Sequence, residues 1–288
     1  MSQRSLKVGL TQWHATRDVA ANVELALRAI RSCAAEEADL VVLPENGLML
    51  GSNAEMREAA FSEGGDPHLE PIADAAREND VVVVVGGVKN TTEHGTFNSA
   101  LVYDRTGELV GRYDKIHLFD ARVGGQSFEA SSVEQAGAEP VIVEVDGVAV
   151  GLTVCYDVRF PELYRALALA GAEVVLVPAA FTRVTGAAHW EVLLRSRAIE
   201  SAAFVVASAT VHGDGEVPDA FETWGHALAV GPWGEVLVDL GEKAFVTTVL
   251  ELDLDQVDAA RDRLPVLRGV RPDAYAAQVR RLTTGATT

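Results

Sequence analysis

The chain has 288 residues, is 48% hydrophobic and carries a formal net charge of −18. This length and apolar content allow one large core or two modest domains, and they exclude a disordered chain. The acidic charge opposes nucleic acid and anionic membranes as partners. No apolar run reaches the roughly 18 residues of a membrane span, and a strand-like segment follows the first residues so closely that no signal peptide fits. We therefore expect a cytoplasmic protein.

Cysteine and histidine usage argues against disulfides and metal sites. The two cysteines, Cys33 and Cys155, are too few for a disulfide framework, which fits a reducing compartment. The histidines and cysteines show no CxxC or HxxxH spacing, so we expect no metal site. The sequence also has no Walker or GxGxxG loop and no GxSxG elbow, and we expect no cofactor.

The two halves of the chain repeat one order of elements. The string VGLT opens both halves, at Val8–Thr11 and at Val150–Thr153. In the first half it is followed by an alanine-rich helix (Ala20–Glu37), an apolar strand (Leu40–Glu45), a second helix, a buried strand (Val81–Val88) and a hairpin turning at Thr106-Gly107. In the second half it is followed by a helix (Pro161–Ala170), a strand (Val174–Ala179), a second helix, a strand (Phe204–Val211) and a hairpin turning at Trp233-Gly234. This match indicates an internal duplication.

The duplicated pattern predicts the architecture. Continuous Val, Ile and Leu strands belong to sheets that are covered on both faces, and alternation of strands with helices is the α/β signature. Two mixed sheets, each with helices on one side, would bury their bare faces against each other. We expect a four-layer αββα sandwich that forms one domain over residues 1–288. The tail from about residue 254 reads as a helix stopped by Pro265 and an extended arm, and such an arm packs on a neighbouring subunit or on its own surface.

Three reactive side chains follow predicted strands. Glu45 follows LVVLP, Cys155 follows VGLTV, and Lys115 follows a hairpin, in the string YDKIHLFD. Chemistry in open α/β sheets collects beyond the carboxyl ends of strands. Each residue alone has an ordinary structural explanation: a loop carboxylate, a solvated lysine and a buried thiol that fills the core. Cys33, on the alanine-rich helix, is an example of the last.

Together the three residues form a chemical set. Lys115 would favour the thiolate of Cys155 and hold the oxyanion of a tetrahedral intermediate, with the Tyr156 N–H as second donor. Glu45 is the candidate general base for the thiol and, later, for water.

Three segments resemble the catalytic segments of the nitrilase superfamily, the carbon–nitrogen hydrolases. They are LPENG, YDKIHLFD and CYDVRFPELYR, in the order of the family, and the resemblance runs from about Val8 to Tyr275. It implies a αββα fold, a triad of Glu45, Lys115 and Cys155, and assembly as a homodimer or a larger homo-oligomer. The family often has a further glutamate after the lysine segment, and the string QSFEASS offers Glu129 for it.

Further residues near these segments are candidates for the substrate pocket. Phe181, Thr182 and Arg183 follow the VVLVP strand, and Arg183 would either suit a substrate with a free carboxylate or pair with an acid on the surface. Asp157 and Arg159 are expected to organise the turn behind Cys155, with Arg159 in a structural ion pair. Alternatively, Arg159 meets a substrate carboxylate.

The sequence thus predicts an amidase that acts on a small carboxamide, resembling the branch of ω-amidases and deaminated-glutathione amidases. Hydrolysis of small aliphatic amides stays open, and so does N-carbamoyl hydrolysis, because the same triad can attack a ureido carbon. Nitrile hydrolysis is less favoured, because nitrilases usually carry a tryptophan where this chain has Tyr156. Two remoter alternatives are an isochorismatase-like cysteine hydrolase, which would have one central sheet, and a binding protein without catalysis.

Overall fold

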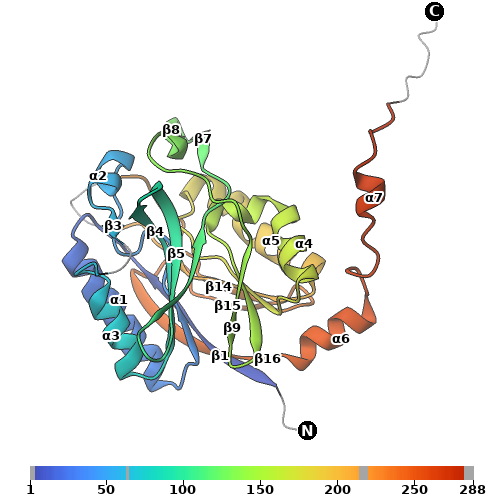
Figure 1. The fold of residues 1–288 in the computed structure, drawn as a ribbon, viewed down its shortest axis with the longest axis horizontal. Coiled ribbons are helices and arrows are strands. Elements are labelled where there is room, and N and C mark those ends of the chain that lie inside the picture. The colour runs from blue at the N-terminus through green and yellow to red at the C-terminus, as the bar shows by residue number, and fades with distance from the viewer. Residues whose placement is uncertain (1–3, 63–64, 214–219, 282–288) are drawn as a thin grey trace, which may run out of the picture.

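The computed structural model describes residues 4–62, 65–213 and 220–281, and they form a four-layer sandwich (Figure 1). Two helices, α1 (Val19–Ala35) and α3 (Glu70–Glu78), lie outside the first sheet. Two others, α4 (Pro161–Leu169) and α5 (Arg183–Ser201), lie outside the second sheet. The αββα architecture predicted from the sequence is confirmed, and the two central sheets exclude the single-sheet alternative.

The first sheet has the order β13-β1-β2-β4-β5-β6, with β16 paired to β1 and β3 paired to β4. Its strands are β1 (Ser5–Trp13), β2 (Leu40–Val42), β3 (Phe61–Ser62), β4 (Val82–Thr92), β5 (Gly95–Tyr103), β6 (Leu109–Asp114), β13 (Ala209–Thr210) and β16 (Phe245–Asp253).

The second sheet has the order β15-β14-β12-β11-β10-β9. Its strands are β9 (Val141–Val145), β10 (Val148–Leu152), β11 (Val174–Leu176), β12 (Phe204–Ala207), β14 (Leu228–Val230) and β15 (Val236–Asp239). The remaining elements are the hairpin β7 (Asp120–Val123) and β8 (Gln126–Glu129), the short helix α2 (Asn53–Glu58), the 3₁₀ turns η1 (Ala130–Ser132) and η2 (Cys155–Arg159), and α6 (Asp255–Arg263) and α7 (Pro272–Tyr275) near the C-terminus.

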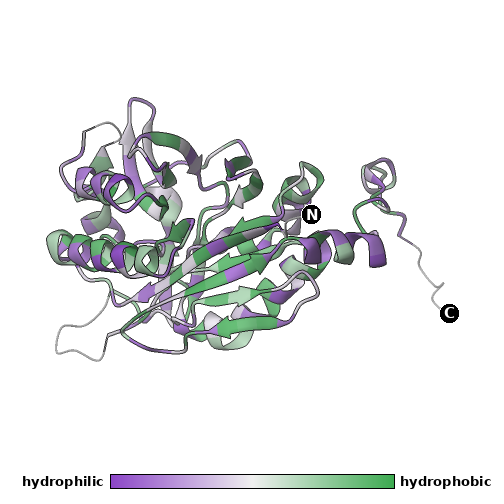
Figure 2. Cartoon of the chain, turned by 90° about the horizontal axis from the view of Figure 1, so that it is seen from below, coloured by the Kyte–Doolittle hydropathy of each residue, from purple (hydrophilic) through white to green (hydrophobic). Residues whose placement is uncertain are grey.

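The strands alternate their side chains between two cores. In β2, Leu40 and Val42 join the core that includes the space between the sheets, whereas Val41 packs under α1 and α3. Successive side chains of a strand point to opposite faces, so a strand with both faces covered must be apolar throughout. Figure 2 shows these strands as mainly hydrophobic. The continuous valine runs of the sequence therefore reflect burial on both sides.

The equivalent strands of the two halves pair in the same way. Gly9 of β1 lies opposite Val41 of β2, and Gly151 of β10 lies opposite Val175 of β11, both in parallel. The two predicted hairpins are present as β5–β6 and β14–β15, both antiparallel.

The predicted strand Phe204–Val211 is in fact divided between the two sheets. Its first part, β12, pairs with β11 in the second sheet, and its last part, β13, pairs with β1 in the first. Ser208 lies at the crossing, where its hydroxyl donates to the Val42 carbonyl at 2.7 Å and accepts from the Thr11 N–H at 3.1 Å. β16 also comes from the second half and pairs antiparallel with β1. The first sheet therefore contains strands from both halves of the sequence.

The C-terminal segment leaves the body of the sandwich. α6 ends at Arg263, shortly before Pro265, as the sequence predicts. Beyond it, α7 projects away from the sheets (Figure 1). Residues 282–288 of the predicted arm lie outside the described residues. None of the described helices combines the length and the apolar composition of a membrane-spanning segment.

Candidate active site

Glu45, Lys115 and Cys155 come together at one edge of the sandwich. They follow β2, β6 and β10, and their exposed fractions are only 3%, 3% and 8%. The Lys115 Nζ donates to Glu45 Oε1 at 2.8 Å, and the Cys155 thiol hydrogen-bonds the Glu45 carboxylate. The fold thus places one buried carboxylate in contact with both an ammonium and a thiol.

The Glu45 carboxylate is held from several sides. Asn98 Nδ2 on β5 donates to its Oε1 at 3.0 Å, and the Ala180 N–H donates to its Oε2 at 2.8 Å. Gly87 of β4 allows this approach, because a Cβ there would lie 2.8 Å from the Glu45 Cγ. Gly87 also has a φ of +61°, which glycine adopts without strain. Both oxygens of Glu45 are therefore fixed before any substrate binds.

Cys155 sits at a strained turn. Its φ is +48°, in the left-handed region that residues other than glycine rarely adopt. The Cys155 N–H donates to the Pro178 carbonyl at 2.9 Å, which fixes the turn to the exit of β11. The next amide, the N–H of Tyr156, has no acceptor in the described residues. It is therefore available to a ligand at the thiol.

Asp157 joins the lysine segment to the cysteine turn. This fully buried carboxylate accepts from the Tyr113 hydroxyl at 2.7 Å, the Val154 N–H at 2.9 Å and the His117 N–H at 3.1 Å. Tyr113 and His117 flank Lys115, whereas Val154 precedes Cys155. The organising role predicted for Asp157 is thus visible in its contacts.

The charges of the site assign each group its protonation state. Burial by itself would raise the pKa of Glu45, but the Lys115 ammonium, with smaller contributions from Lys89 and the Cys155 hydrogen bond, holds that pKa below its ordinary value. Burial works to lower the pKa of Lys115, and the Glu45 carboxylate raises it above its ordinary value. Burial, together with Glu45, raises the pKa of the Cys155 thiol well above its ordinary value despite Lys115. The resting site is therefore a carboxylate, an ammonium and a neutral thiol, not the thiolate expected from Lys115 alone.

A small pocket of about 60 Å³ opens onto these three side chains. Its lining is aromatic on one side, with Phe119, Phe128 and Phe221 beside Tyr156 and Phe181. Phe128 lies on β8 of the β7–β8 hairpin, and Phe119 directly precedes β7. Their ring centroids are 5.1 Å apart. The hairpin therefore forms part of the pocket wall.

Of the predicted substrate-binding residues, Tyr156, Arg159, Phe181 and Thr182 line this pocket. The Arg159 guanidinium lies 5.9 Å from the Tyr156 ring centroid and 5.0 Å from that of Phe181. It contacts His189 at 3.3 Å and has no carboxylate partner within the described residues. Arg159 thus brings a positive charge to the pocket that no acidic side chain there neutralises.

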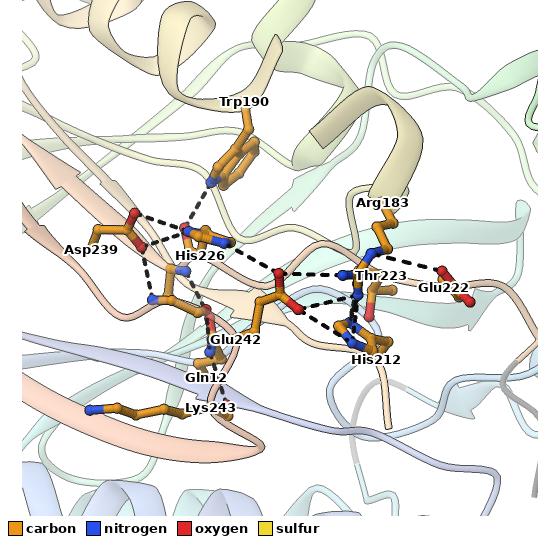
Figure 3. A network of polar contacts seen from close by, with 12 residues as sticks. Gln12, Arg183, Trp190, His212, Glu222, Thr223, His226, Asp239, Glu242 and Lys243 are labelled. Carbon is orange, nitrogen blue, oxygen red and sulfur yellow. Dashed lines mark hydrogen bonds and ion pairs between the residues drawn. The ribbon is translucent and has the colours of Figure 1, made fainter. Parts of the chain in front are cut away.

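Arg183 lies outside the pocket lining. Figure 3 shows it in a separate polar network, where its Nη1 lies 3.2 Å from Glu242 Oε2 and 2.6 Å from His212 Nε2. Arg183 begins α5, and its guanidinium turns toward the loop after β15, which carries Glu242. The alternative of a surface ion pair therefore describes this residue.

Glu129 also lies outside the pocket. It is exposed at the end of β8, its carboxylate accepts from Ser127 at 3.2 Å, and its carbonyl accepts from Asn53 at 3.2 Å. The second acid of the pocket, besides Glu45, is Glu134, five residues later and 5% exposed. One turn and the η1 helix separate the two glutamates, so their spacing in the string FEASSVE could not show which of them is turned inward.

Two polar pocket residues on strands of the first sheet were also missed in the sequence. Lys89 on β4 and Asn98 on β5 both line the pocket and lie directly opposite each other in the antiparallel register. A lysine in the apolar run VVVVVGGVKN and an asparagine inside a strand are departures from the hydrophobic pattern. Those departures are the signal that sequence reading could have used.

Comparisons with known proteins decide the family. Residues 7–262 match the family described as carbon–nitrogen hydrolase. The chain belongs to this family. It is 35% identical over 260 residues to the deaminated glutathione amidase of Yersinia enterocolitica, covering 88% of this chain and 87% of that protein. It is also 32% identical over 279 residues to the omega-amidase NIT2 of Homo sapiens, covering 96% of this chain and 99% of that protein.

A solved structure shows the same fold. Nit3 of Saccharomyces cerevisiae, a member of branch 10 of the nitrilase superfamily, superposes with a TM-score of 0.82 at 26% identity, covering 92% of this chain and 96% of that chain. This carbon–nitrogen hydrolase is therefore an enzyme of the amidase type, and the resemblance found in its sequence is confirmed.

Proposed function

We propose that this carbon–nitrogen hydrolase converts a small linear carboxamide to a carboxylate and ammonia through a thioester on Cys155. The observation that carries the proposal is the contact of Glu45 with both Lys115 and the Cys155 thiol, all three of them buried side chains that line one pocket. A covalent route divides one difficult hydrolysis into two easier steps.

In the first step Glu45 takes the thiol proton as Cys155 Sγ attacks the amide carbon. The raised pKa of the thiol supports concerted transfer, because little free thiolate exists before the substrate arrives. The oxyanion forms between the Lys115 ammonium and the Tyr156 N–H. The C–N bond then breaks, and Glu45 returns its proton to the nitrogen, which leaves as ammonia.

In the second step a water molecule attacks the thioester while Glu45 accepts one of its protons. The tetrahedral intermediate collapses, the C–S bond breaks, and the proton returns to the departing sulfur. The cycle thus uses one carboxylate as base, acid and base again, which requires the fixed position that Asn98 and Ala180 give it.

For the substrate, we propose an amide that carries a carboxylate at its far end. Arg159 supports this, because its guanidinium reaches the pocket without an acidic partner in the described residues. The names of the relatives, omega-amidase and deaminated glutathione amidase, agree with such a substrate. An ion pair between the Arg159 guanidinium and the substrate carboxylate would orient the substrate as well as bind it.

The test is ammonia release from a substrate panel by the wild type, Cys155→Ser and Cys33→Ser. The panel contains aliphatic amides, ω-amides of dicarboxylates, deaminated glutathione, an N-carbamoyl amino acid and a nitrile. We expect release from the ω-amides that vanishes in Cys155→Ser and persists in Cys33→Ser. Release that survives in Cys155→Ser would refute the thioester mechanism, and a preference for uncharged amides would refute the substrate class.

We further propose that the chain is a single domain that forms homodimers or larger homo-oligomers. Val184, Val192 and Ile199 of α5 are large apolar side chains exposed on one helix, and the arm beyond α6 projects from the body. Light scattering of the purified protein should give at least twice the mass of 30.6 kDa. A monomer would contradict this proposal.

A further inference from the structure

The pocket contains a second buried ion pair. Lys89 and Glu134 form it, with exposed fractions of 8% and 5%, and both line the pocket beside the Glu45–Lys115 pair. Lys89 comes from β4, whereas Glu134 comes from the loop after η1. Taking two charges out of water is costly, and apolar side chains of similar volume would often be more stable. Stability alone therefore does not explain the presence of this pair in the pocket.

The backbone connects this second pair to the first. Gln135, next to Glu134, donates its N–H to the Thr96 carbonyl at 2.8 Å, and the Gly137 N–H donates to the Lys115 carbonyl at 2.9 Å. Gly137 is close-packed there, since a Cβ would lie 2.0 Å from the Asp114 carbonyl oxygen. The loop that carries Glu134 is thus fixed against the strand end that carries Lys115.

Lys89 is connected in the same way to the residue that holds Glu45. It lies directly opposite Asn98 in the β4–β5 register, and the Lys115 N–H donates to the Asn98 carbonyl at 2.8 Å. The backbone of Asn98 therefore connects the strand that carries Lys89 to the residue Lys115 of the other pair.

The four charges balance. Glu45 and Glu134 each contribute a negative carboxylate, and Lys115 and Lys89 each contribute a positive ammonium group. The net charge of the four is zero while the thiol is neutral. The charge of Glu134 acts on Lys115, and that of Lys89 acts on Glu45. Without Lys89, Glu134 would be an uncompensated carboxylate close to the ammonium that must stabilise the oxyanion. The charge of Glu134 would then oppose the negative charge that develops in the transition state.

We propose that Lys89 and Glu134 are positioning residues for the hydrolysis, in which Lys89 neutralises Glu134 so that the charge of Lys115 stays available to Glu45 and the oxyanion. The inference rests on the proposed function of Cys155, Glu45 and Lys115. In this inference Lys89 does not contact the substrate. It acts on Lys115 by neutralising the charge of Glu134.

The experiment compares Lys89→Met, Glu134→Gln and the double variant Lys89→Met/Glu134→Gln with the wild type. Glu173→Gln is the matched control, because it breaks the partly buried pair with Arg4 outside the pocket lining. We expect Lys89→Met to lower kcat by roughly 100-fold with little change in KM, and the double variant to recover to within about tenfold of the wild type. Glu173→Gln should leave kcat within about twofold.

A structural role alone would give a different pattern. It would lower the thermal unfolding midpoint of Lys89→Met without a selective loss of kcat in the folded enzyme, and that result would overturn the proposal. A double variant no faster than Lys89→Met would also overturn it, because removing the carboxylate must relieve the loss of the lysine. If Lys89→Met does not fold, the charge-balanced double variant and Glu134→Gln supply the comparison.

A readout independent of turnover separates this inference from the proposed function. Iodoacetamide alkylation of Cys155, followed by peptide mass spectrometry, should slow roughly tenfold in Lys89→Met and recover in the double variant. Equal alkylation rates in all variants would overturn the inference. Failure of the wild type to hydrolyse any amide would instead refute the proposed function, while the alkylation rates still test Lys89 and Glu134.

Discussion

The two cysteines of this chain show what makes a buried thiol reactive. Cys33 on α1 and Cys155 at the end of β10 are both buried, and burial raises the pKa of both thiols, that of Cys33 to about 12. Cys33 packs so closely on β1 that a Cβ at Gly9 would lie 2.8 Å from its Sγ. Cys155 instead has a carboxylate in contact and an ammonium beside it. Neither cysteine is activated by exposure, so the difference lies in the neighbours that can move its proton.

Removal of the proposed base should have the largest effect. Glu45→Gln keeps the shape of the side chain but cannot accept the thiol proton, and we expect kcat to fall by roughly 10³-fold. The control is Glu36→Gln, which changes the acid whose charge acts on Cys33 and should leave kcat unchanged. Steady-state ammonia release measures both. A loss below about tenfold in Glu45→Gln would show that another group takes the proton.

Alkylation should distinguish the two thiols directly. Iodoacetamide is itself a small amide, and we expect it to modify Cys155 at least roughly 100-fold faster than Cys33 in the folded protein. Peptide mapping by mass spectrometry over a time course gives both rates in one sample. Comparable rates would mean that local opening, and not the catalytic neighbours, controls access to Cys155.

Substitution of Cys33 should change stability and spare catalysis. Cys33→Ser puts a hydroxyl into an apolar environment, and we expect the free energy of unfolding to fall by about 1–3 kcal/mol. Urea denaturation measures this, and kcat of the folded variant should stay within about twofold of the wild type. A large loss of kcat would connect α1 to the active site, contrary to the comparison above.

The pH dependence of the reaction should be the smallest of these effects. A general base must be deprotonated, and Lys115 holds the pKa of Glu45 below its ordinary value. The acid limb of kcat/KM should therefore lie below about pH 4.3, the ordinary value for glutamate, and activity should be level just above it. An acid limb centred near pH 6 would mean that burial outweighs Lys115 and that the assigned charge state is wrong.

The sequence by itself was enough to predict the layers and the three reactive groups. Strand and helix periodicity are local properties, so the runs around Val41 and Val175 indicated strands buried on both faces. Residues that directly follow such strands, Glu45 and Cys155 among them, must lie at the same edge of their sheets. Because these two sheets are different, the convergence of Glu45 and Cys155 with Lys115 followed from the resemblance to the carbon–nitrogen hydrolases and not from strand position. The match of the two halves could be read from the sequence directly.

Only the tertiary structure decided which loop residues face the pocket. Glu134 is turned inward and Glu129 outward because backbone contacts to Thr96 and Lys115 fix the loop, and those partners are distant in the sequence. Arg183 turns toward His212 and Glu242, which the chain brings to it from later segments. The crossing of Ser208 between the sheets likewise depends on contacts with Thr11 and Val42. Such choices depend on long-range contacts that leave no periodic pattern, so the sequence supplied the reactive groups and the fold selected their neighbours.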